Sequence, residues 1–466
     1  MKTVEQIYTG CLAQGAYFIE SEGEAAVIDP LRETLPYIRR AEEKGVKIKY
    51  IFETHFHADF VSGHVDLAHK TGATIVYGPT AETSFESHIA HDGEEFTIGK
   101  IKIRVLHTPG HTPESTTYLL INESGKEEAI FTGDTLFIGD VGRPDLAQKS
   151  THLTQEDLAG WLFDSLRTKI MPLPDHIIVY PAHGAGSACG KNMSSETTDT
   201  LGNQKRTNYA LRATMTRDEF IQEVTQGLLP PPQYFAKNAM MNKQGYKEFD
   251  KVMSEGSRPL SVKEFEMLAE EDDVLMLDVR HQKDFVKGHV PGSIFIGLDG
   301  SFAPWVGALI PDINQKIILI TPEGREEETV MRLSRVGYDH ALGFLKGGFL
   351  AWKDAGKDVA EIESIDIPTF INKYETDSSI NILDVRKPKE WETSHVPTSV
   401  NFPLDFLNQH MNEVLPGQQY FLYCRTGYRS TISASILKSR GYHNLVDVIG
   451  AFEDMKVEEM PMGITT

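Results

Sequence analysis

The first half of the chain consists of short apolar segments separated by polar loops. Four of these segments are rich in β-branched or aromatic residues and are bounded by turn residues, which predicts β-strands. Each predicted strand is followed at once by histidine or aspartate side chains. Loops at strand ends carry function on a rigid scaffold, so we expect these side chains to converge at one rim of a sheet. The predicted strands are Lys47–Phe52, Ile101–Leu106, Glu128–Phe131 and His176–Tyr180.

The second half of the chain contains an internal repeat. The apolar segment Val274–Arg280 recurs as Ile380–Arg386, and the aspartates of the two copies are 384 − 278 = 106 residues apart. The segment His289–Pro291 likewise recurs as His395–Pro397. Apolar strands that alternate with helical stretches predict two α/β domains with central parallel sheets.

These patterns predict a multidomain α/β protein. With 466 residues, the chain is too long for a single hydrophobic core. The proline cluster Leu229–Pro232 and the amide- and lysine-rich stretch up to about residue 255 are interpreted as a connection between domains. The predicted domains are residues 1–245, 256–360 and 361–466.

Composition limits the classes of partner. The formal net charge of −21 opposes binding to nucleic acid or to an anionic membrane. No apolar run reaches membrane-spanning length, and the first residues do not resemble a signal peptide. The three cysteines are odd in number and widely spaced, which predicts free thiols rather than a disulfide framework. We therefore expect a cytoplasmic protein.

A cluster of potential metal ligands follows the first predicted strand. Imidazole and carboxylate groups are the ligands of zinc and of non-haem iron. His55 and His57 lie two residues apart, and they need not bind the same ion. The potential ligands, in chain order, are His55, His57, Asp59, His111, Asp134 and His183.

This set resembles the metallo-β-lactamase superfamily, whose ligand run is His-x-His-x-Asp-His followed by separate His, Asp and His residues. Hydrolases of the superfamily commonly hold two metal ions. Here Phe60 stands where the run has its last histidine, and a phenyl ring cannot bind a metal. The resemblance implies an αββα sandwich, and Phe60 implies that the second metal site has lost a ligand.

One branch of the superfamily, the persulfide dioxygenases, holds a single Fe(II) ion with two histidines and one carboxylate. This facial triad of non-haem iron oxygenases leaves positions open for oxygen and substrate. By the resemblance, the iron ligands are His55, His111 and Asp134, with zinc as a substitute metal. The residues that would orient these ligands or bound water are His57, Asp59 and His183.

Further residues bear on the substrate. The guanidinium of Arg143 suits a carboxylate or phosphate, and the resemblance places such an arginine near the substrate's anionic groups; a loop-stabilising role is the alternative. Relatives that use glutathione carry tyrosine two residues after the last histidine, where this chain has Ala185. A persulfide of coenzyme A or bacillithiol is therefore expected at least as readily as that of glutathione. Cys189 is interpreted as a loop cysteine, or else as part of the entrance to the metal pocket, and Cys11 as a packed apolar residue.

A second candidate site lies in the second repeat, between the predicted strand Tyr420–Tyr423 and a predicted helix from Ser430 to Arg440. A loop that enters a helix N-terminus points backbone N–H groups inward and favours an anion. A cysteine in such a loop, beside arginines, is expected to be a thiolate nucleophile. The residues concerned are Cys424, Arg425, Gly427 and Arg429.

This loop resembles that of the rhodanese sulfurtransferases, which hold a persulfide. Cysteine phosphatases place five residues between the cysteine and the arginine, whereas here four intervene and Ser430 follows. The first repeat has Thr321–Glu328 at this place, with an acidic run and without a cysteine. That domain is expected to lack sulfur-transfer activity and to serve as a spacer or docking surface.

The order of the parts resembles bacterial persulfide dioxygenase–rhodanese fusions used in sulfide detoxification. The resemblance implies that a small persulfide reacts with O2 to give sulfite, and that sulfite takes sulfur from Cys424 to give thiosulfate. A homo-oligomer is expected, without nucleic-acid or membrane partners. Two alternatives stay open. One is a zinc thioester hydrolase resembling glyoxalase II, against which Phe60 argues, and the other is a sulfur-relay or persulfide-binding protein.

Overall fold

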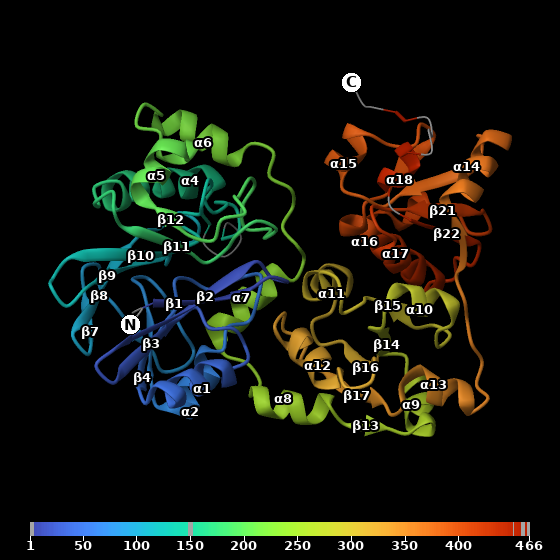
Figure 1. Cartoon of the computed structure of the whole chain (residues 1–466), viewed down its shortest axis with the longest axis horizontal. Coiled ribbons are helices and arrows are strands. Elements are labelled where there is room, and N and C mark those ends of the chain that lie inside the picture. Colours follow the sequence, from blue (N-terminus) through green and yellow to red (C-terminus); the bar gives the residue numbers. More distant parts are fainter. Residues whose placement is uncertain (1–3, 148–151, 451, 458–461, 464–466) are drawn as a thin grey trace. The chain divides into compact units, whose positions relative to one another are not determined.

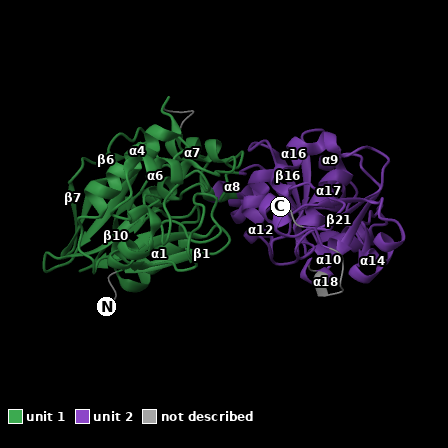
Figure 2. Ribbon diagram, turned by 90° about the horizontal axis from the view of Figure 1, so that it is seen from above, with its two compact units in different colours: residues 1–249, 334–337 green, residues 250–333, 338–466 purple. Residues whose placement is uncertain are grey.

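The computed structural model describes residues 4–147, 152–450, 452–457 and 462–463 (Figure 1). The chain forms two compact units (Figure 2). The first unit comprises residues 1–249 and 334–337, and the second comprises residues 250–333 and 338–466. Within the described residues each unit contains two β-sheets.

The first unit contains two six-stranded sheets, with strand orders β1-β2-β3-β4-β5-β6 and β12-β11-β10-β9-β8-β7. Strands β3, β4 and β5 are parallel neighbours in the first sheet, and β10 and β11 are parallel neighbours in the second. The strands are β1 (Val4–Thr9), β2 (Gln14–Ser21), β3 (Glu24–Ile28), β4 (Lys47–Phe52), β5 (Thr74–Tyr77), β6 (His88–Ile89), β7 (Glu95–Ile98), β8 (Ile101–His107), β9 (Thr116–Ile121), β10 (Glu127–Gly133), β11 (Ile178–Pro181) and β12 (Asp199–Thr200).

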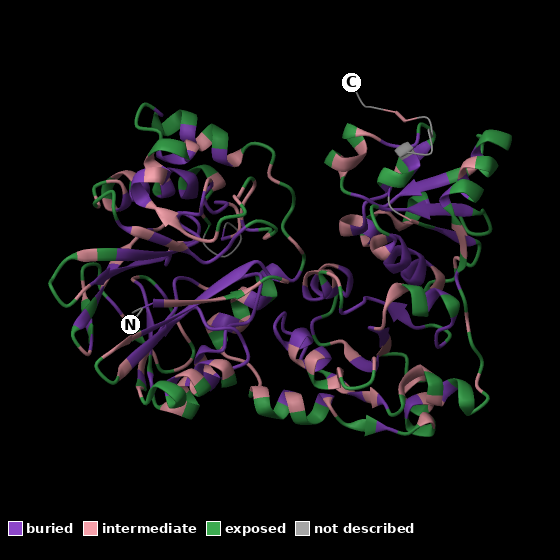
Figure 3. Cartoon of the chain, viewed as in Figure 1, coloured by how far each residue is buried: buried purple, intermediate pink, exposed green. Residues whose placement is uncertain are grey.

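Apolar side chains fill the space between these sheets and cover both outer faces. Phe52 of the first sheet packs against Tyr118 of the second, with ring centroids 4.9 Å apart. Helices α1 and α2 cover the first sheet, and helices α4, α5 and α6 cover the second. The strands are accordingly drawn largely as buried (Figure 3). The helices are α1 (Leu35–Lys44), α2 (His64–Thr71), α4 (Gln155–Ser165), α5 (Leu201–Thr207), α6 (Arg217–Thr225), α7 (Phe235–Gln244) and α8 (Phe249–Gly256).

The second unit contains two five-stranded sheets of the same topology, β13-β17-β16-β14-β15 and β18-β22-β21-β19-β20. All neighbouring strands in both sheets run parallel. The strands are β13 (Pro259–Leu260), β14 (Val274–Asp278), β15 (Ile294–Phe295), β16 (Lys316–Ile320), β17 (Ala341–Leu345), β18 (Glu363–Asp366), β19 (Asn381–Asp384), β20 (Ser399–Asn401), β21 (Tyr420–Tyr423) and β22 (Leu445–Ile449).

Helices connect these parallel strands, as crossover connections require. In the first sheet's domain they are α9 (Val262–Ala269), α10 (Gln282–Lys287), α11 (Phe302–Leu309), α12 (Glu326–Ser334) and α13 (Gly348–Asp354). In the second they are α14 (Ile367–Thr376), α15 (Pro388–Thr393), α16 (Leu407–His410), α17 (Tyr428–Ser439) and α18 (Phe452–Val457).

The repeated Asp-Val-Arg motif makes the same ion pair in both domains. Arg386 Nη2 lies 2.5 Å from Asp384 Oδ2, and Arg280 Nη2 lies 2.6 Å from Asp278 Oδ2. Each guanidinium also donates to a backbone carbonyl eight residues further along the chain. The motif therefore pairs a buried strand-end carboxylate with a cation and ties the following helix to the sheet.

The expected fold class, an αββα sandwich followed by two parallel α/β domains, is confirmed. The strand expected over His176–Tyr180 begins later, at Ile178, because the Ile177 N–H donates to Pro174 in a turn. The stretch interpreted as a connection is largely helical, since it forms α7 and α8. Among the described helices, none is both long and apolar enough to cross a bilayer.

Candidate metal centre and thiol site

The candidate metal centre lies beyond strand ends that belong to two different sheets. His55 follows β4 in the first sheet, whereas His111, Asp134 and His183 follow β8, β10 and β11 in the second. The expectation that all of them meet at one rim of a single sheet was wrong in this respect. Face-to-face packing of the sheets, rather than strand pairing alone, brings the loop after β4 to the other loops.

The three predicted iron ligands face a common point. His111 Nε2 lies 3.4 Å from Asp134 Oδ2, and His55 Nε2 lies 3.9 Å from the same oxygen. All three residues are buried, and one donor atom of each lies within 4.8 Å of the others. Asp134 Oδ2 has no hydrogen-bond partner among the described residues. A buried carboxylate oxygen left unpaired between two imidazole nitrogens fits a metal ion bound by all three.

Outer contacts fix the orientation of both imidazole rings. His55 Nδ1 lies 3.0 Å from Thr54 Oγ1, and that hydroxyl donates to Asp29 Oδ2 at 2.9 Å. His111 Nδ1 lies 2.8 Å from the backbone oxygen of Arg143. Each ring therefore presents Nε2 to the candidate metal site, as is usual for histidine ligands. Sequence inspection missed Thr54 and Asp29, although Thr54 adjoins the ligand run.

Electrostatics at the site favours the ionisation states that bind a cation. Burial lowers the pKa of His55 well below its ordinary value, and the neighbouring His57 lowers it further. Burial by itself raises the pKa of Asp134, but His183, His55 and His111 bring it well below its ordinary value. A neutral imidazole and an anionic carboxylate are the forms that a metal ion requires.

His57 turns away from the triad. Its Nε2 lies 3.0 Å from Asp29 Oδ1 and 3.6 Å from Glu53 Oε2, and these three residues form a separate buried cluster. The fully buried ring of Phe60 packs on His57 at a centroid distance of 4.4 Å. His57 therefore anchors the loop to the interior of the unit. Its predicted influence on ligands or bound water stays a prediction.

Asp59 and His183 lie beside the triad and connect to it through Asp134. His183 Nδ1 lies 2.8 Å from Asp134 Oδ1, and His183 Nε2 lies 2.8 Å from Asp59 Oδ2. Burial disfavours the imidazolium, but Asp134 and Asp59 raise the pKa of His183 well above its ordinary value. One oxygen of Asp134 thus binds His183 while the other faces the triad, and the predicted role of Asp59 and His183 in orienting ligands or bound water stays a prediction.

The helix α7 forms hydrogen bonds with the backbone of the metal loop, which sequence inspection did not anticipate. The buried amide of Asn242 donates to the carbonyls of His57 and Phe60, at 2.8 Å each. The amide oxygen accepts from the Ser62 N–H at 2.9 Å. One side chain thus satisfies three backbone groups around the Asp59-Phe60 pair. Asn242 is far from the metal loop in sequence, so only the tertiary structure reveals this role.

Arg143 makes its hydrogen bonds within the protein. Its Nε and Nη2 donate to the two oxygens of Asp145, at 2.6 and 2.7 Å. Nη2 also donates to the Leu229 carbonyl, and Nη1 to that of Ala188. This buried arrangement fits the loop-stabilising interpretation. Binding of a substrate anion by Arg143 stays a prediction.

Cys189 is buried at the metal centre. Its Sγ lies within 4.8 Å of donor atoms of Asp59 and His183. Burial raises the pKa of the Cys189 thiol well above its ordinary value, and Asp59 and Asp134 raise it further. As a neutral thiol, Cys189 is a poor nucleophile. Cys11 is half-buried in the loop after β1 and is free, as are Cys189 and Cys424.

The thiol site has the expected geometry of a loop entering a helix. Cys424 directly follows β21 and is buried, and its Sγ accepts a hydrogen bond from the Gly427 N–H at 3.1 Å. Gly427 has φ of 85°, a left-handed conformation that suits glycine, and α17 begins at the next residue. Arg429 pairs with Glu390 at 2.7 and 2.9 Å, whereas Arg425 is exposed.

The corresponding loop of the first repeat is filled by its own side chains. Gly324 has φ of 80°, like Gly427, but its N–H donates to Glu326 at 3.2 Å. Arg325 is held by Glu328 and Asp299, at 2.7 Å in each case. A carboxylate thus takes a backbone N–H that an anion would need. The expectation that this domain lacks sulfur-transfer activity stays a prediction.

The chain is similar to two known protein families. The family model of the metallo-beta-lactamase superfamily matches residues 9–183, and the model of the rhodanese-like domain matches residues 261–355 and 369–458. The human mitochondrial persulfide dioxygenase ETHE1 is 31% identical over 212 residues, which covers 45% of this chain and 74% of the relative. The chain belongs to the persulfide dioxygenase–rhodanese fusions of the metallo-β-lactamase superfamily.

Two further proteins are similar to this chain, one in structure and one in sequence. A metallo-beta-lactamase from Staphylococcus aureus has a crystal structure similar to this chain with a TM-score of 0.64 and 33% identity, covering 73% of this chain and 97% of that one. A probable hydroxyacylglutathione hydrolase of Schizosaccharomyces pombe is 30% identical over 182 residues, covering 38% of this chain. This chain spans 66% of the length of that hydrolase.

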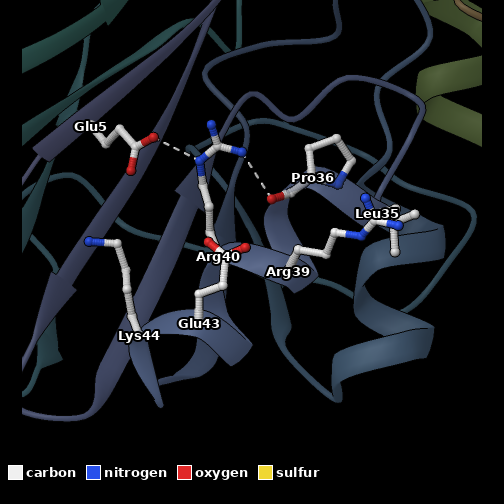
Figure 4. A pocket seen from close by; sticks show the side chains of 7 residues that line it. All are labelled: Glu5, Leu35, Pro36, Arg39, Arg40, Glu43 and Lys44. Atoms are coloured by element: carbon white, nitrogen blue, oxygen red, sulfur yellow. Dashed lines mark hydrogen bonds and ion pairs between the residues drawn. The ribbon is translucent and has the colours of Figure 1, made fainter.

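The first unit also has a surface pocket lined by residues outside the metal centre. It has a volume of about 460 Å³ and lies along α1 (Figure 4). Arg40 reaches across it to Glu5 at 2.8 Å and to the Pro36 carbonyl at 3.0 Å. Its lining residues, which include neither histidine nor cysteine, are Glu5, Leu35, Pro36, Arg39, Arg40, Glu43 and Lys44.

Proposed function

We propose that this protein is a non-haem Fe(II) persulfide dioxygenase coupled to a rhodanese that forms thiosulfate. The observation that carries the proposal is the convergence of His55, His111 and Asp134, with Phe60 in place of a further imidazole. Two histidines and one carboxylate leave a face of an iron ion open for oxygen and substrate. Likeness to the human persulfide dioxygenase supports the same activity.

In the proposed first reaction, a small persulfide RSSH, O2 and H2O give RSH, sulfite and two protons. The bound iron would supply the redox chemistry. The chain's own residues hold the donor atoms: Thr54 and the Arg143 carbonyl orient the two imidazoles, and His183 holds Asp134. Because all three predicted ligands are buried, bulk water is largely kept from the centre.

In the proposed second reaction, Cys424 takes the terminal sulfur of another persulfide and passes it to sulfite, which leaves as thiosulfate. The Gly427 N–H, 3.1 Å from Sγ, is placed to stabilise negative charge on sulfur. Arg429 adds positive charge, although burial opposes that charge and Glu390 raises the pKa of the guanidinium above its ordinary value. Arg425 remains available to an incoming anion, since it is exposed.

The proposed carrier thiol is coenzyme A, bacillithiol or glutathione. Ala185 stands where glutathione-using relatives carry a tyrosine, so we propose coenzyme A or bacillithiol at least as readily as glutathione. Persulfides of coenzyme A or bacillithiol fit this change. A reducing cytoplasm is the proposed location, because Cys11, Cys189 and Cys424 are all free.

The proposal is tested by metal analysis and by an oxygen electrode. Protein purified without oxygen is expected to contain about one iron per chain and to consume O2 when coenzyme A, bacillithiol or glutathione persulfide is added. Phe60→His tests the deciding residue, because it would restore an imidazole for a second ion and is expected to lower O2 uptake. No O2 uptake by the iron-loaded chain with any of the three persulfides would disprove the dioxygenase.

The second candidate is a zinc thioester hydrolase of the glyoxalase II type, favoured by the likeness to the S. pombe hydrolase. Two zinc ions per chain together with thioester hydrolysis would establish it. The remaining alternative, a persulfide-binding or sulfur-relay protein, predicts persulfide binding without O2 consumption. The electrode measurement therefore separates the dioxygenase from both alternatives, and zinc analysis with a thioester hydrolysis assay separates the alternatives from each other.

A further inference from the structure

The buried carboxyl of Asp447 lies next to the first turn of α17, the helix that follows the thiol loop (residues 424–427). Its Oδ2 lies 2.8 Å from Thr431 Oγ1, and both side chains are 1% exposed. Its Oδ1 has no hydrogen-bond partner in the part of the chain that the structure describes. A buried carboxyl with an unpaired oxygen is unfavourable for folding, so its presence here calls for an explanation.

Thr431 also contacts the backbone of the thiol loop. Its Oγ1 lies 2.7 Å from the Gly427 carbonyl, which Ser430 Oγ reaches at the longer distance of 3.2 Å. The N–H of the same glycine lies 3.1 Å from Cys424 Sγ. Gly427 is therefore held at both ends, by a hydroxyl at its carbonyl and by the sulfur at its N–H. Through Thr431, the carboxyl of Asp447 is linked to the residue that faces the sulfur.

The Thr431 hydroxyl has one proton and two possible acceptors. When Asp447 is ionised, the proton goes to the carboxylate, because a charged acceptor binds it more strongly than a carbonyl does. When Asp447 is protonated, its O–H donates to Thr431 Oγ1, and Thr431 donates to the Gly427 carbonyl. Only in this form are both short contacts of the hydroxyl hydrogen bonds. The protonation state of Asp447 therefore decides whether Thr431 holds the Gly427 carbonyl.

The surroundings of the Asp447 carboxyl are uncharged among the described residues. Those beside it in the sheet or facing it from the helix are Leu422 of β21, Ser364 of β18, and Ser430 and Thr431 of α17. Arg429, in the first turn of α17, is paired with Glu390. Burial raises the pKa of Asp447 to about 6, and the two hydroxyls oppose the shift. The carboxyl therefore changes its charge near neutral pH, close to the helix N-terminus that favours an anion.

The cysteine-free domain lacks this pair of side chains. The loop glycines of the two repeats are 427 − 324 = 103 residues apart. By this offset Phe344 stands in place of Asp447, and the strand pairing of the two sheets gives the same correspondence. Glu328 stands in place of Thr431. The fold therefore does not require a carboxyl at this position, and the carboxyl and the hydroxyl occur together in the domain that has the nucleophile.

We propose that Asp447 is a positioning residue for sulfur transfer at Cys424, acting through the Thr431 hydroxyl on Gly427. The inference rests on the proposed rhodanese activity and adds two residues to it. With Asp447 protonated, the loop is held by the additional hydrogen bond. With Asp447 ionised, that bond is lost and a negative charge opposes the charge on the sulfur.

Asp447→Asn is the test variant, because its side chain is neutral at every pH and its amide can still donate to Thr431. Sulfur transfer from thiosulfate to cyanide is measured for the full-length parent and variant, and the ratio of their kcat/KM values cancels the ionisation of cyanide. The ratio of variant to parent should be constant below about pH 5 and should rise at least about threefold above about pH 7. A ratio that stays constant with pH in an active parent would overturn the proposal.

Two substitutions of Thr431 separate positioning from general support of the helix. Thr431→Val removes the hydroxyl and is expected to slow transfer at least about threefold, whereas Thr431→Ser keeps it and should retain the parent's rate and pH dependence. Ser433→Ala is the matched control, since buried Ser433 donates to the Arg429 carbonyl at 3.0 Å within the same helix. Circular dichroism confirms that each variant is folded. Equal losses in Ser433→Ala and Thr431→Val would refute the link to Asp447.

Alkylation of Cys424 provides a measurement that does not depend on sulfur transfer. Iodoacetamide reacts with the thiolate, and mass spectrometry of the peptide that contains Cys424 gives the rate. Above about pH 7, Asp447→Asn should react at least about twofold faster than the parent, because no carboxylate opposes the thiolate. Equal rates at every pH would also overturn the proposal. If the parent lacks sulfur transfer but the alkylation rates differ in this way, the proposed rhodanese activity fails while the influence of Asp447 on Cys424 stands.

Discussion

At the scale of single residues, Asn242 shows how one buried amide supports the metal loop. Its side chain satisfies the carbonyls of His57 and Phe60 and the N–H of Ser62. Asn242→Ala would leave these three backbone groups buried and unpaired, so we expect the free energy of unfolding to fall by about 3 kcal/mol. Urea denaturation of the metal-free protein measures this change.

Asn238 offers a matched control in the same helix. It is equally buried, but its amide oxygen and nitrogen have no hydrogen-bond partner among the residues described. Asn238→Ala removes an unpaired polar group, and we expect it to change the free energy of unfolding by less than about 1 kcal/mol. Equal effects of the two substitutions would show that Asn242 does not support the metal loop through its hydrogen bonds.

The buried carboxyl of Asp447 is expected to make the free energy of unfolding depend on pH. Burial raises its pKa from 3.8 to about 6, although hydrogen bonds from Ser430 and Thr431 oppose the shift. The folded state therefore prefers the protonated form, and stability decreases as pH rises from 3.8 to about 6. A difference of about two pH units corresponds to about 3 kcal/mol.

Thermal unfolding across this pH range checks the effect. Asp447→Asn keeps an uncharged side chain at every pH, so the melting temperature of the variant should exceed that of the parent above pH 6 and the gap should close toward pH 3.8. A gap that is constant with pH would mean that ionisation of Asp447 is not responsible.

At the scale of elements, α17 links the cysteine-containing domain to its cysteine-free neighbour. The residues from Ser430 to Leu437 are all buried. Ser435 Oγ accepts from the Phe295 N–H of the edge strand β15 at 2.9 Å, and Tyr428 donates to the Gly297 carbonyl at 2.6 Å. The neighbouring domain therefore supports the helix whose N-terminus faces Cys424.

A substitution at Gly300 tests whether the neighbouring domain supports α17. A Cβ at this position would lie 2.3 Å from Tyr428 Cζ, so Gly300→Ala must displace the ring. We expect a loss of about 1–3 kcal/mol in stability and slower sulfur transfer from thiosulfate to cyanide, because the start of α17 moves. Tyr428→Phe is the control, since it keeps the ring and removes only one hydrogen bond. Unchanged sulfur transfer in Gly300→Ala would contradict a supporting role for this contact.

Elements were predicted best where the local pattern decides them. The strands β4, β14 and β21 lie within the expected apolar segments, because strand and segment share the same alternation and turn residues. The helices α7 and α8 were not expected, since α7 is amide-rich and the whole stretch was interpreted as a connection between domains. Asn238 and Asn242 are buried by packing against other parts of the unit, which local composition does not report.

At the scale of the whole molecule, the metal triad and Cys424 belong to different compact units. Their chemistry should therefore be separable by substitution. His111→Ala is expected to remove bound iron and to reduce O2 uptake to less than about 1%, while sulfur transfer by Cys424 persists. Cys424→Ser should have the reverse effect, with sulfite accumulating in place of thiosulfate.

Oxygen electrode, iron analysis and separate assays of sulfite and thiosulfate measure both effects. Removal of metal by a chelator should reproduce the His111→Ala result without affecting the parent's sulfur transfer. Loss of both activities from either substitution would indicate that the units depend on each other. An unchanged ratio of thiosulfate to sulfite in Cys424→Ser would show that the two reactions are not coupled.

The sequence by itself determined the kinds of chemistry in this chain. Its motifs are local features that can be recognised from the amino-acid sequence alone. They are the spacing of His55, Asp59 and Phe60, the internal repeat and the loop around Cys424. Only the tertiary structure decided the direction of His57 and the meeting of Cys189 with Asp59. The reason is physical: loop backbones and the packing of two sheets set where a side chain points, and these contacts join residues distant in sequence.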